Sequence, residues 1–542
     1  MRTIWPAEPP LRVNPPSAPR RPPISARGLL GLVVPLIVAV IGLVIVALLG
    51  VISALAPQLA FALAALLALL AVGGGLLYWI APGGPLWVRA CLLVVLAHLL
   101  LSYGFGNATV GIGSVRAPVS ELVLVVALIG SLAYLWRVGY RQLPFPLWLF
   151  VLWQLVLLVV HLPRGFEAYG MPALRDALPT VQILFVIPGY CIAIKVLQDP
   201  DKQRWIARFL LALGLTTAVY GLAYPLQSAL LVISPRMTGM QQAVPLFGYY
   251  STWPTVAVTG MFGVLLWRWA APTTAHPQRD AALAFLMLIG FVVGFFLIQS
   301  RAGYVMVLAV TMLIAMAGGQ SRTTWRIIGV LAIAAVVLLA MSMLGLEVEG
   351  RIGKKISLES IIEQTMTLSG EAERGSDMEG AAAGIQQRRH WREMSLHMWA
   401  RNGTTMAVGV GYGPALTDFQ VAGTGGAAVV VREPHNSYVS ALARSGFIGF
   451  TILMLFHATV FFGALRLYKR LRAADDKPRA AVILGAAIFF ICNYLNALGQ
   501  PNFESPHFVV PYFFAAGIVI ALMHTSAKGT GSISRASLRT TS

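Results

Sequence analysis

The stretch Glu433-Pro434-His435-Asn436-Ser437-Tyr438 stands where a polar segment of 89 residues (346–434) ends and a long apolar run begins. An apolar helix that starts on Pro-His-Asn brings an imidazole and several free backbone N–H groups to the point where the chain enters a membrane. A helix start of this kind can hold an anion and accept a proton. The sequence on both sides of this stretch consists mostly of apolar runs.

Composition places the chain among membrane proteins. Of its 542 residues, 57% are hydrophobic and only 11% are charged, which is too apolar for a soluble globular protein. Most apolar runs are long enough to cross the hydrocarbon core as a helix, and they lack the alternation of a membrane β-barrel. We therefore predict an all-α polytopic membrane protein with about 12–14 transmembrane helices.

The runs predict five segments along the chain. Residues 1–28 are a Pro-rich, basic and disordered tail, 29–345 and 435–524 hold the transmembrane helices, 346–434 form one large, partly helical loop, and 525–542 are a second tail. The predicted spans are 29–56, 58–80, 86–103, 119–136, 145–162, 178–197, 205–231, 249–270, 281–299, 301–318, 325–345, 435–464, 479–497 and 508–524.

Charge placement predicts the orientation. With both termini in the cytoplasm, the inner segments carry 25 of the 40 Lys and Arg residues, and the short outer loops carry only five. This asymmetry is the one that the positive-inside rule expects, so the large loop is predicted to be periplasmic or extracellular.

The large loop has two parts of different composition. Eleven of the 21 acidic residues lie in the loop, and its first part, 347–379, has the composition of a flexible segment. The second part, Ile385–Ala400, is predicted to form an amphipathic helix at the membrane surface, because apolar side chains recur at helical spacing. We expect Trp391, Met394 and Met398 on one face of this helix and Arg388, Arg389 and Arg392 on the opposite face.

Three ionisable residues near the apolar runs are candidates for chemistry. Arg301 interrupts the run 281–318, which predicts two spans joined by a tight turn with the arginine at their mouth, either in a functional site or reaching lipid headgroups. His435 is either a proton acceptor or a structural cap, and Asn436 and Ser437 are expected to cap the helix. Arg444 lies within a span, where it is either functional or paired with an acid such as Glu504 or Glu121.

Several function classes are excluded or unsupported. The net charge of +19 resides mostly in short loops between spans, so we discard nucleic-acid binding. Cys91, Cys191 and Cys492 lie in separate apolar runs, which gives no disulfide framework and no thiolate metal site. Neither a nucleotide-binding nor a metal-binding motif is found, so no cofactor is predicted.

Four motifs together resemble the O-antigen ligase and O-antigen polymerase superfamily of bacterial membrane proteins. They are QSRAGY at Gln299–Tyr304, an Arg-x-x-Trp segment at Arg388–Trp391, GVGYG at Gly409–Gly413, and PHNSYVSALARSGFIG at Pro434–Gly449. The resemblance covers about residues 281–465, and the last motif is its most specific part.

The resemblance implies a metal-independent, inverting glycosyltransferase of the inner membrane whose active site faces the periplasm. Its donor would be a glycan linked to undecaprenyl diphosphate, and its acceptor a sugar hydroxyl of lipid A-core. Arg301 and His435 would be catalytic, the arginine binding the diphosphate leaving group and the histidine accepting the hydroxyl proton. Arg388, Arg389, Arg392, Asn436 and Tyr438 would bind the substrates.

Several alternatives stay open at this level, among them a protein O-oligosaccharyltransferase and a membrane scaffold whose loop binds partners. An O-antigen or exopolysaccharide polymerase would use the same donor chemistry with a second lipid-linked glycan as acceptor. A polytopic transporter of lipid-linked glycans would also need many helices and intramembrane arginines, although it predicts internal repeats, and no clear repeat is present in the sequence.

Overall fold

The computed structural model describes residues 81–317 and 379–537 with short gaps. It also describes isolated positions between 75 and 79 and between 325 and 340. The gaps within the two long ranges are 113–114, 139–143, 198–199, 224–225, 227–230, 233, 235, 239–242, 246–252, 271–276, 299, 419 and 423–427. The predicted spans 29–56, 58–80 and 325–345, the tail 1–28 and the acidic segment 347–379 lie essentially outside the described residues. Residues 73–542 form one compact unit.

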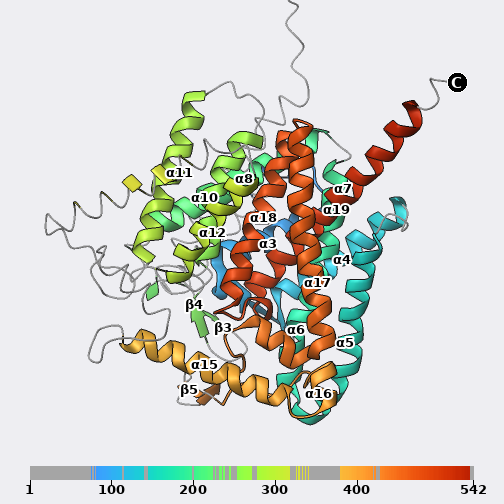
Figure 1. Ribbon diagram of the computed structural model, residues 1–542, viewed down its shortest axis with the longest axis vertical. Coiled ribbons are helices and arrows are strands. Elements are labelled where there is room, and N and C mark those ends of the chain that lie inside the picture. Colours follow the sequence, from blue (N-terminus) through green and yellow to red (C-terminus); the bar gives the residue numbers. More distant parts are fainter. Residues whose placement is uncertain are drawn as a thin grey trace, which may run out of the picture. The chain divides into compact units, whose positions relative to one another are not determined.

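The described part of this unit is built from helices (Figure 1). Seven of the described helices are long and apolar enough to cross a membrane, which confirms the prediction of an all-α, multi-pass membrane protein. A helix satisfies every backbone hydrogen bond within its own segment, and hydrocarbon offers no other partner. The seven are Leu86–Gly106, Val119–Arg137, Pro146–Tyr169, Met171–Val196, Ser437–Ala473, Lys477–Ala497 and Pro506–Ser526.

The chain order of the principal helices is α3 (Leu86–Gly106), α4 (Val119–Val138), α5 (Phe145–Tyr169), α6 (Met171–Gln182), α7 (Val186–Leu197), α8 (Pro200–Leu222), α10 (Trp253–Ala270), α11 (Pro277–Ile298), α12 (Arg301–Ala317), α15 (Glu379–Trp399), α16 (Gly403–Val408), α17 (Ser437–Ala473), α18 (Lys477–Ala497) and α19 (Pro506–Ser537). Three two-stranded antiparallel hairpins join some of them: β1 (Thr109–Ile112) with β2 (Val115–Pro118), β3 (Arg236–Thr238) with β4 (Ala243–Pro245), and β5 (Gln420–Ala422) with β6 (Ala428–Val430).

Two helix boundaries differ from those that the apolar runs suggest. The run 145–162 continues as α5 through Pro163 to Tyr169, and the chain turns at Gly170, whose φ of 66° is available to glycine at little cost. The helical segment that contains the run 178–197 starts earlier, with α6 at Met171. It continues through a short 3-10 segment (Ile183–Phe185) into α7. The run 281–318 does split as expected, because α11 ends at Ile298 and α12 begins at Arg301.

The centre of the bundle contains α19, which packs against α3, α7 and α17. Glycines allow the closest of these contacts. A Cβ atom on Gly189 of α7 would lie 2.2 Å from the Phe514 carbonyl oxygen, and one on Gly517 would lie 2.1 Å from that of Val186. Small residues at such crossings let two membrane helices touch backbone to backbone.

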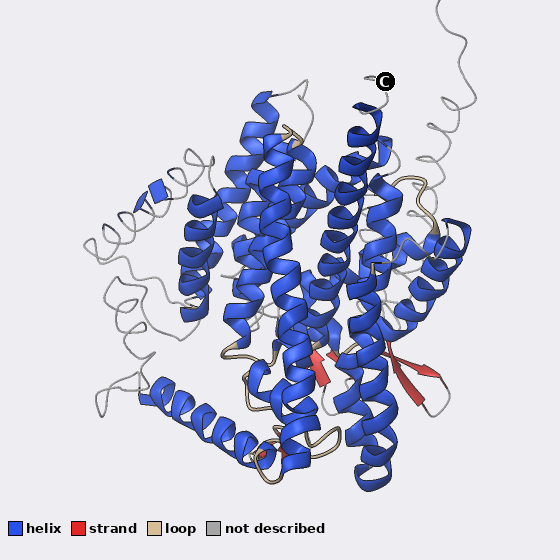
Figure 2. Cartoon of the chain, turned by 45° about the vertical axis from the view of Figure 1, so that its right-hand side comes forward, coloured by secondary structure: helices blue, strands red, loops and turns tan. Residues whose placement is uncertain are grey.

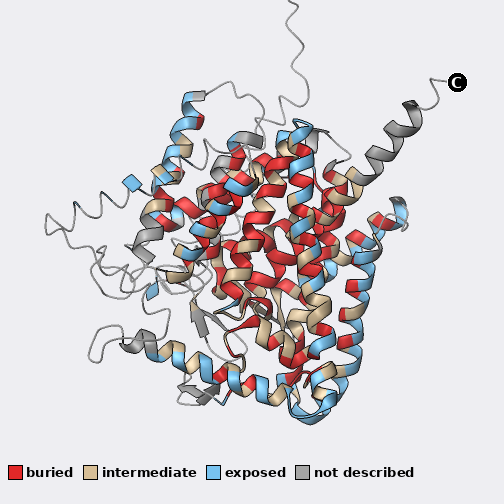
Figure 3. Ribbon diagram, viewed as in Figure 1, coloured by how far each residue is buried: buried red, intermediate tan, exposed pale blue. Residues whose placement is uncertain are grey.

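Burial distinguishes an interior from a lipid-facing surface. Buried residues concentrate on the inner helices, whereas α4 and α5 carry long exposed stretches (Figure 3). Leu149, Leu152, Val156 and Val159 are exposed on α5 at helical spacing. An apolar stripe of this length is expected to contact lipid.

The described part of the large loop, from Glu379 on, folds against one end of the bundle. In Figures 1 and 2, α15 runs across the ends of the upright helices, and it contacts α16 and α17. The predicted helix at Ile385–Ala400 is confirmed, although it begins earlier, at Glu379. The side of α15 that faces the bundle carries the buried residues Trp391 and Ser395.

The predicted opposition of tryptophan and arginines on this helix is wrong for two of the three arginines. Arg388 and Arg392 are half-buried beside Trp391, and only Arg389 is exposed. Three residues correspond to about 300° of rotation, so Arg388 lies about 60° from Trp391, on the side that contacts the bundle.

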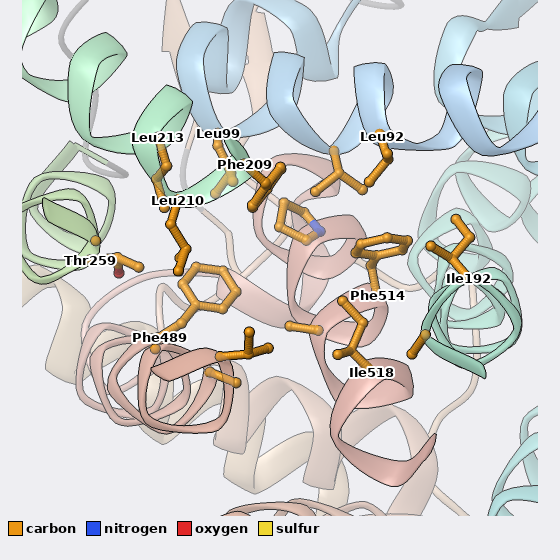
Figure 4. Close-up of a pocket in the computed structure, with 18 of the residues that line it drawn as sticks. Leu92, Leu99, Ile192, Phe209, Leu210, Leu213, Thr259, Phe489, Phe514 and Ile518 are labelled. Atoms are coloured by element: carbon orange, nitrogen blue, oxygen red, sulfur yellow. The ribbon is translucent and has the colours of Figure 1, made fainter. Parts of the chain in front are cut away.

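An apolar cavity of about 180 Å³ lies among α3, α7, α8, α10, α18 and α19 (Figure 4). Its wall includes Leu99, Phe209, Phe489 and Phe514, with the Thr259 hydroxyl as a polar group. Walls of this kind do not suit a charged diphosphate or a sugar. This cavity is therefore a poor candidate for the site that the sequence predicts.

Candidate active site

The site is organised around the start of α17. Asn436 caps this helix, because its Oδ1 accepts hydrogen bonds of 3.1 Å from the backbone N–H groups of both Tyr438 and Val439. Its Nδ2 donates to the Leu498 carbonyl oxygen at 3.0 Å. The predicted capping role of Asn436 is thus confirmed, and the cap fixes the position of His435 directly before it.

His435 has an unusual conformation and an unusual environment. It is one of three described non-glycine residues with positive φ, here 51°. Its half-buried ring lies 5.4 Å from the Trp391 ring, centroid to centroid. Burial and then the nearby Arg388 charge lower the pKa of His435 to about 4, while an interaction with the Gln500 side chain acts in the opposite direction. The imidazole is therefore neutral at pH 7 and able to accept a proton.

One arginine, Arg388, lies near this imidazole, and two further arginines act on Arg388. Burial, followed by the charges of Arg301 and Arg392, lowers the pKa of Arg388. Arg388 thus lies within electrostatic range of Arg301, at the start of α12, and of His435. Mutual repulsion of this kind is relieved by a bound anion, and guanidinium groups suit the oxygens of a phosphate.

Helix α12 presents Arg301 at its first turn. The Ser300 hydroxyl oxygen accepts a hydrogen bond of 3.3 Å from the Gly303 backbone N–H, as a capping residue does. The positive end of the helix dipole therefore adds to the arginine charge at this position.

The remaining predicted binding residues lie in other surroundings. Arg389 is exposed and pairs with Glu393 at 3.2 Å, one turn along α15. The Tyr438 hydroxyl donates to the Tyr494 carbonyl oxygen at 3.1 Å, inside the bundle. Asn436 has both amide groups engaged by the protein. Arg301, Arg388, Arg392 and His435 are the predicted residues that the fold brings together.

A buried ion cluster underlies this group. Arg444 is 8% exposed and pairs with Asp176 at 3.1 Å and with Glu433 at 2.6 Å. Arg432 makes a bidentate contact with the same Asp176 carboxylate, at 3.0 and 2.7 Å. The salt bridges of Arg444 thus differ from the predicted ones: Glu504 adds only a weaker attraction, and Glu121 binds Gln182 instead.

This cluster holds the glycine-rich loop Gly409–Gly413. The Gly413 N–H donates to Asp176 Oδ2 at 3.1 Å, and Arg444 Nη1 donates to the Gly411 carbonyl oxygen at 3.2 Å. The loop backbone also pairs with α17, where the Gly411 N–H donates to the Arg444 carbonyl oxygen at 3.0 Å. GVGYG is therefore a structural loop that ties the large loop to α6 and α17.

The turn between α18 and α19 supports the start of α17 from the other side. The Ser437 hydroxyl donates to Glu504 Oε2 at 2.6 Å and accepts from the Phe503 N–H at 3.0 Å. On the other side of the same helix start, the Glu433 carboxylate accepts a hydrogen bond of 2.6 Å from the Ser440 hydroxyl. Burial, and then the charge of Glu433, raise the pKa of Glu504.

Sequence reasoning missed Asp176, Glu433 and Gln500 as parts of the site. One signal was available for Asp176, because it is a lone acid in a largely apolar helix, where an ionised group needs a partner. Gln500 carries no comparable signal, since a glutamine in a turn between two spans is unremarkable. Within the described ranges, no group of three or more His, Cys, Asp or Glu side chains could hold a metal ion.

Comparison with known proteins bears on the same segment. Residues 282–454 match the family model described as O-antigen ligase, which confirms the resemblance inferred from the motifs. The match includes Arg301, Arg388 and His435. No curated protein shows significant similarity to the chain.

Proposed function

Because residues 282–454 match the family model described as O-antigen ligase, we propose that this multi-pass membrane protein transfers a glycan from undecaprenyl diphosphate to a sugar hydroxyl of lipid A-core. The inner membrane is its proposed location, with the site facing the periplasm. The observation that carries the proposal is the position of Arg388, within electrostatic range of both Arg301 and His435. A cationic group and a neutral imidazole are thus neighbours.

The donor places the first demand on this site. When the anomeric C–O bond breaks, negative charge grows on the leaving diphosphate, and positioned cations stabilise that charge. Arg301, Arg388 and Arg392 supply permanently charged groups for it. Arg389 is left out of this set because it is exposed and paired with Glu393.

The acceptor places the second demand. His435 accepts the hydroxyl proton while the oxygen forms its bond to the anomeric carbon, and attack opposite the leaving group inverts the configuration. In the free protein the pKa of His435 is about 4, lowered by burial and by Arg388. A bound diphosphate neutralises that arginine, so the pKa rises toward the range in which a base works at neutral pH.

Reconstitution in liposomes tests the proposal. The protein is supplied with an undecaprenyl-linked glycan and with one of two acceptors, lipid A-core or a second lipid-linked glycan. We expect a product on lipid A-core, loss of that product in His435→Gln, and normal turnover in the matched control His397→Gln, whose side chain is exposed on α15.

Other outcomes of the same experiment contradict the proposal in distinct ways. A product formed only on the lipid-linked acceptor identifies a polymerase with the same donor chemistry. Movement of intact donor across the bilayer without any new glycosidic bond identifies a transporter. Full activity in His435→Gln removes the histidine from the mechanism.

A further inference from the structure

His435 lies between two anchored residues. A positive φ at a residue other than glycine is strained, and it persists only where the surroundings impose it. Two residues before the histidine, the Glu433 carboxylate accepts hydrogen bonds of 2.6 Å from both Arg444 and Ser440. Two residues after it, Ser437 is fully buried and binds the turn between α18 and α19. The backbone on both sides of the histidine is therefore fixed.

The Ser437 hydroxyl forms the second of these anchors. It donates to Glu504 Oε2 at 2.6 Å and accepts a hydrogen bond of 3.0 Å from the Phe503 backbone N–H. The Gln500 carbonyl oxygen lies 3.2 Å away, as a second and weaker acceptor. The prediction that this serine caps α17 is wrong, because Asn436 alone provides the cap. The hydroxyl serves the contact with the turn instead.

The turn itself, Leu498–Glu504, is held in place by buried amides. Asn502 is fully buried, and its Nδ2 donates to the Asn493 carbonyl oxygen at 3.2 Å. The Asn496 side chain donates to Asn502 Oδ1 at 3.0 Å. Asn436 adds a second bridge from α17, because its Nδ2 donates to the Leu498 carbonyl oxygen at 3.0 Å. The start of α17 is therefore attached to a fixed part of the bundle.

We propose that the hydrogen bond between Ser437 and Glu504 is a positioning contact for proton transfer, because it attaches the residues that follow His435 to the turn between α18 and α19. The inference rests on the proposed function. It extends that function to a turn outside the segment that matches the family, since Glu504 follows residue 454. Both residues act through the backbone of the histidine and not on the substrates. A catalytic group that is displaced by about 1 Å can lose about 100-fold in rate, so this contact affects kcat.

The charge state of Glu504 determines which substitution preserves the contact. Burial, and then the charge of Glu433, raise the pKa of Glu504 to about 8, so its carboxyl is mostly neutral at pH 7. A glutamine keeps the size, the neutral state and an oxygen that accepts from Ser437. A leucine removes that acceptor and leaves the weaker contact with the Gln500 carbonyl oxygen.

The test measures transfer by Ser437→Ala, Glu504→Leu and Glu504→Gln in the full-length protein in liposomes. Ser437→Ala should lower kcat by about 100-fold with the donor KM unchanged, because the arginines proposed to bind the diphosphate lie on α12 and α15. Glu504→Leu should lose less, because the serine hydroxyl keeps its second acceptor. Glu504→Gln should recover most of kcat.

The matched control is Ser445→Ala. It also removes a serine hydroxyl from α17, but this hydroxyl donates within its own helix, to the Ala441 carbonyl oxygen at 2.6 Å. Its kcat and melting temperature should match those of the wild type.

Three results overturn the inference while leaving the proposed function intact. A wild-type kcat in Ser437→Ala shows that the contact has no effect on transfer. A raised donor KM at unchanged kcat shows that the contact acts on donor binding. Equal losses in Glu504→Gln and Glu504→Leu show that the acceptor offered to Ser437 is not the property that matters.

A second readout needs no glycan transfer. In protein labelled with 15N-histidine, the His435 signals are assigned by their loss in His435→Gln and are then followed against pH. Burial is the largest cause that lowers the pKa of His435, so a displaced ring that gains solvent should titrate at higher pH in Ser437→Ala. Ser445→Ala should titrate as the wild type does.

A change in the His435 midpoint reports on the surroundings of the ring, because Ser437→Ala removes no charge. The charged groups of the site all remain in this variant; they are Arg388 and Arg392 on α15, Arg301 on α12, Glu433 and Glu504. If no acceptor receives glycan, the proposed function fails, and the titration still decides the positioning role: an unchanged His435 midpoint in Ser437→Ala refutes it.

Discussion

At the level of single residues, His435 bears two costs that a simple helix cap does not need. It has positive φ, and its buried Nδ1 has no hydrogen-bond partner among the described residues. Each feature costs on the order of 1–3 kcal/mol. Asn436 alone caps α17, so neither feature is required to start the helix. Costs of this kind collect at functional sites, which supports a role for His435 beyond starting the helix.

Arg388 should control the pH dependence of transfer. His435 must be neutral to accept a proton, so activity is lost as the pH falls through its pKa. The Arg388 charge lowers that pKa, which is about 4 in the free protein. In Arg388→Gln we therefore expect the acidic limb of kcat/KM to move to higher pH, together with weaker donor binding, as measured by initial rates between pH 4 and pH 9.

The matched control for this prediction is Arg389→Gln. It removes an equal charge one residue away, from an exposed arginine that pairs with Glu393. Its acidic limb should coincide with that of the wild type. An unshifted limb in Arg388→Gln would show that the arginine does not act on His435.

The family resemblance, together with the residue types, selected Arg301, Arg388 and His435 as candidates for one site. A phosphate binder needs permanent cations, and a proton acceptor that works near neutral pH is most often an imidazole. Their neighbours were harder to predict. Asp176 precedes Arg444 by more than 250 residues, and only the tertiary structure reveals the buried salt bridge between them.

At the level of elements, the close contact between the 403–414 segment and α17 depends on two glycines. Gly446 has a φ of 66° within α17, and a Cβ atom there would lie 2.3 Å from the Ala407 carbonyl oxygen. Gly409 has a φ of 84°, and its Cβ would lie 2.1 Å from the Arg444 carbonyl oxygen. Backbone meets backbone here, so neither side can yield by rotating a side chain.

Gly446→Ala should therefore detach this segment from α17. The added methyl group is strained by the positive φ, at a cost of about 1–3 kcal/mol, and it also collides with the Ala407 backbone. We expect a lower melting temperature in detergent, faster protease cleavage between α16 and β5, and reduced transfer.

Gly403→Ala is the control, because a Cβ atom at Gly403, the first residue of α16, meets nothing within 4 Å. Its melting temperature and cleavage rate should match those of the wild type. Equal stability of Gly446→Ala and the wild type would show that the segment is held elsewhere.

Periodicity predicts helices better than it predicts their ends or their contacts. The amphipathic pattern predicted α15, and the polar interruption at Arg301 predicted that the run 281–318 divides into α11 and α12. The helix ends depend on local geometry, such as the turn at Gly170. Which face of α15 meets the bundle depends on tertiary packing, and the burial pattern of Trp391, Arg388 and Arg392 does not follow from the amphipathic pattern alone.

At the level of the whole molecule, the length of α17 bears on its orientation. The helix has 37 residues, which corresponds to about 55 Å and exceeds the roughly 30 Å of hydrocarbon. Its last turns carry Arg466, Lys469, Arg470 and Arg472, beyond the apolar part. Basic residues at this end favour the cytoplasm, so we predict that the His435 end and α15 lie on the periplasmic side.

Labelling of single cysteines in intact cells tests this orientation. The three native cysteines are buried, so they are expected to react poorly, and a membrane-impermeant maleimide then reports on an introduced thiol. Glu393→Cys places that thiol on the exposed side of α15, and Asp475→Cys places it in the turn between α17 and α18. The charge distribution predicts immediate labelling at 393 once the outer membrane is permeable, and labelling at 475 only after the inner membrane is disrupted. The reverse pattern would put His435 and its arginines in the cytoplasm, where a periplasmic acceptor could not reach them.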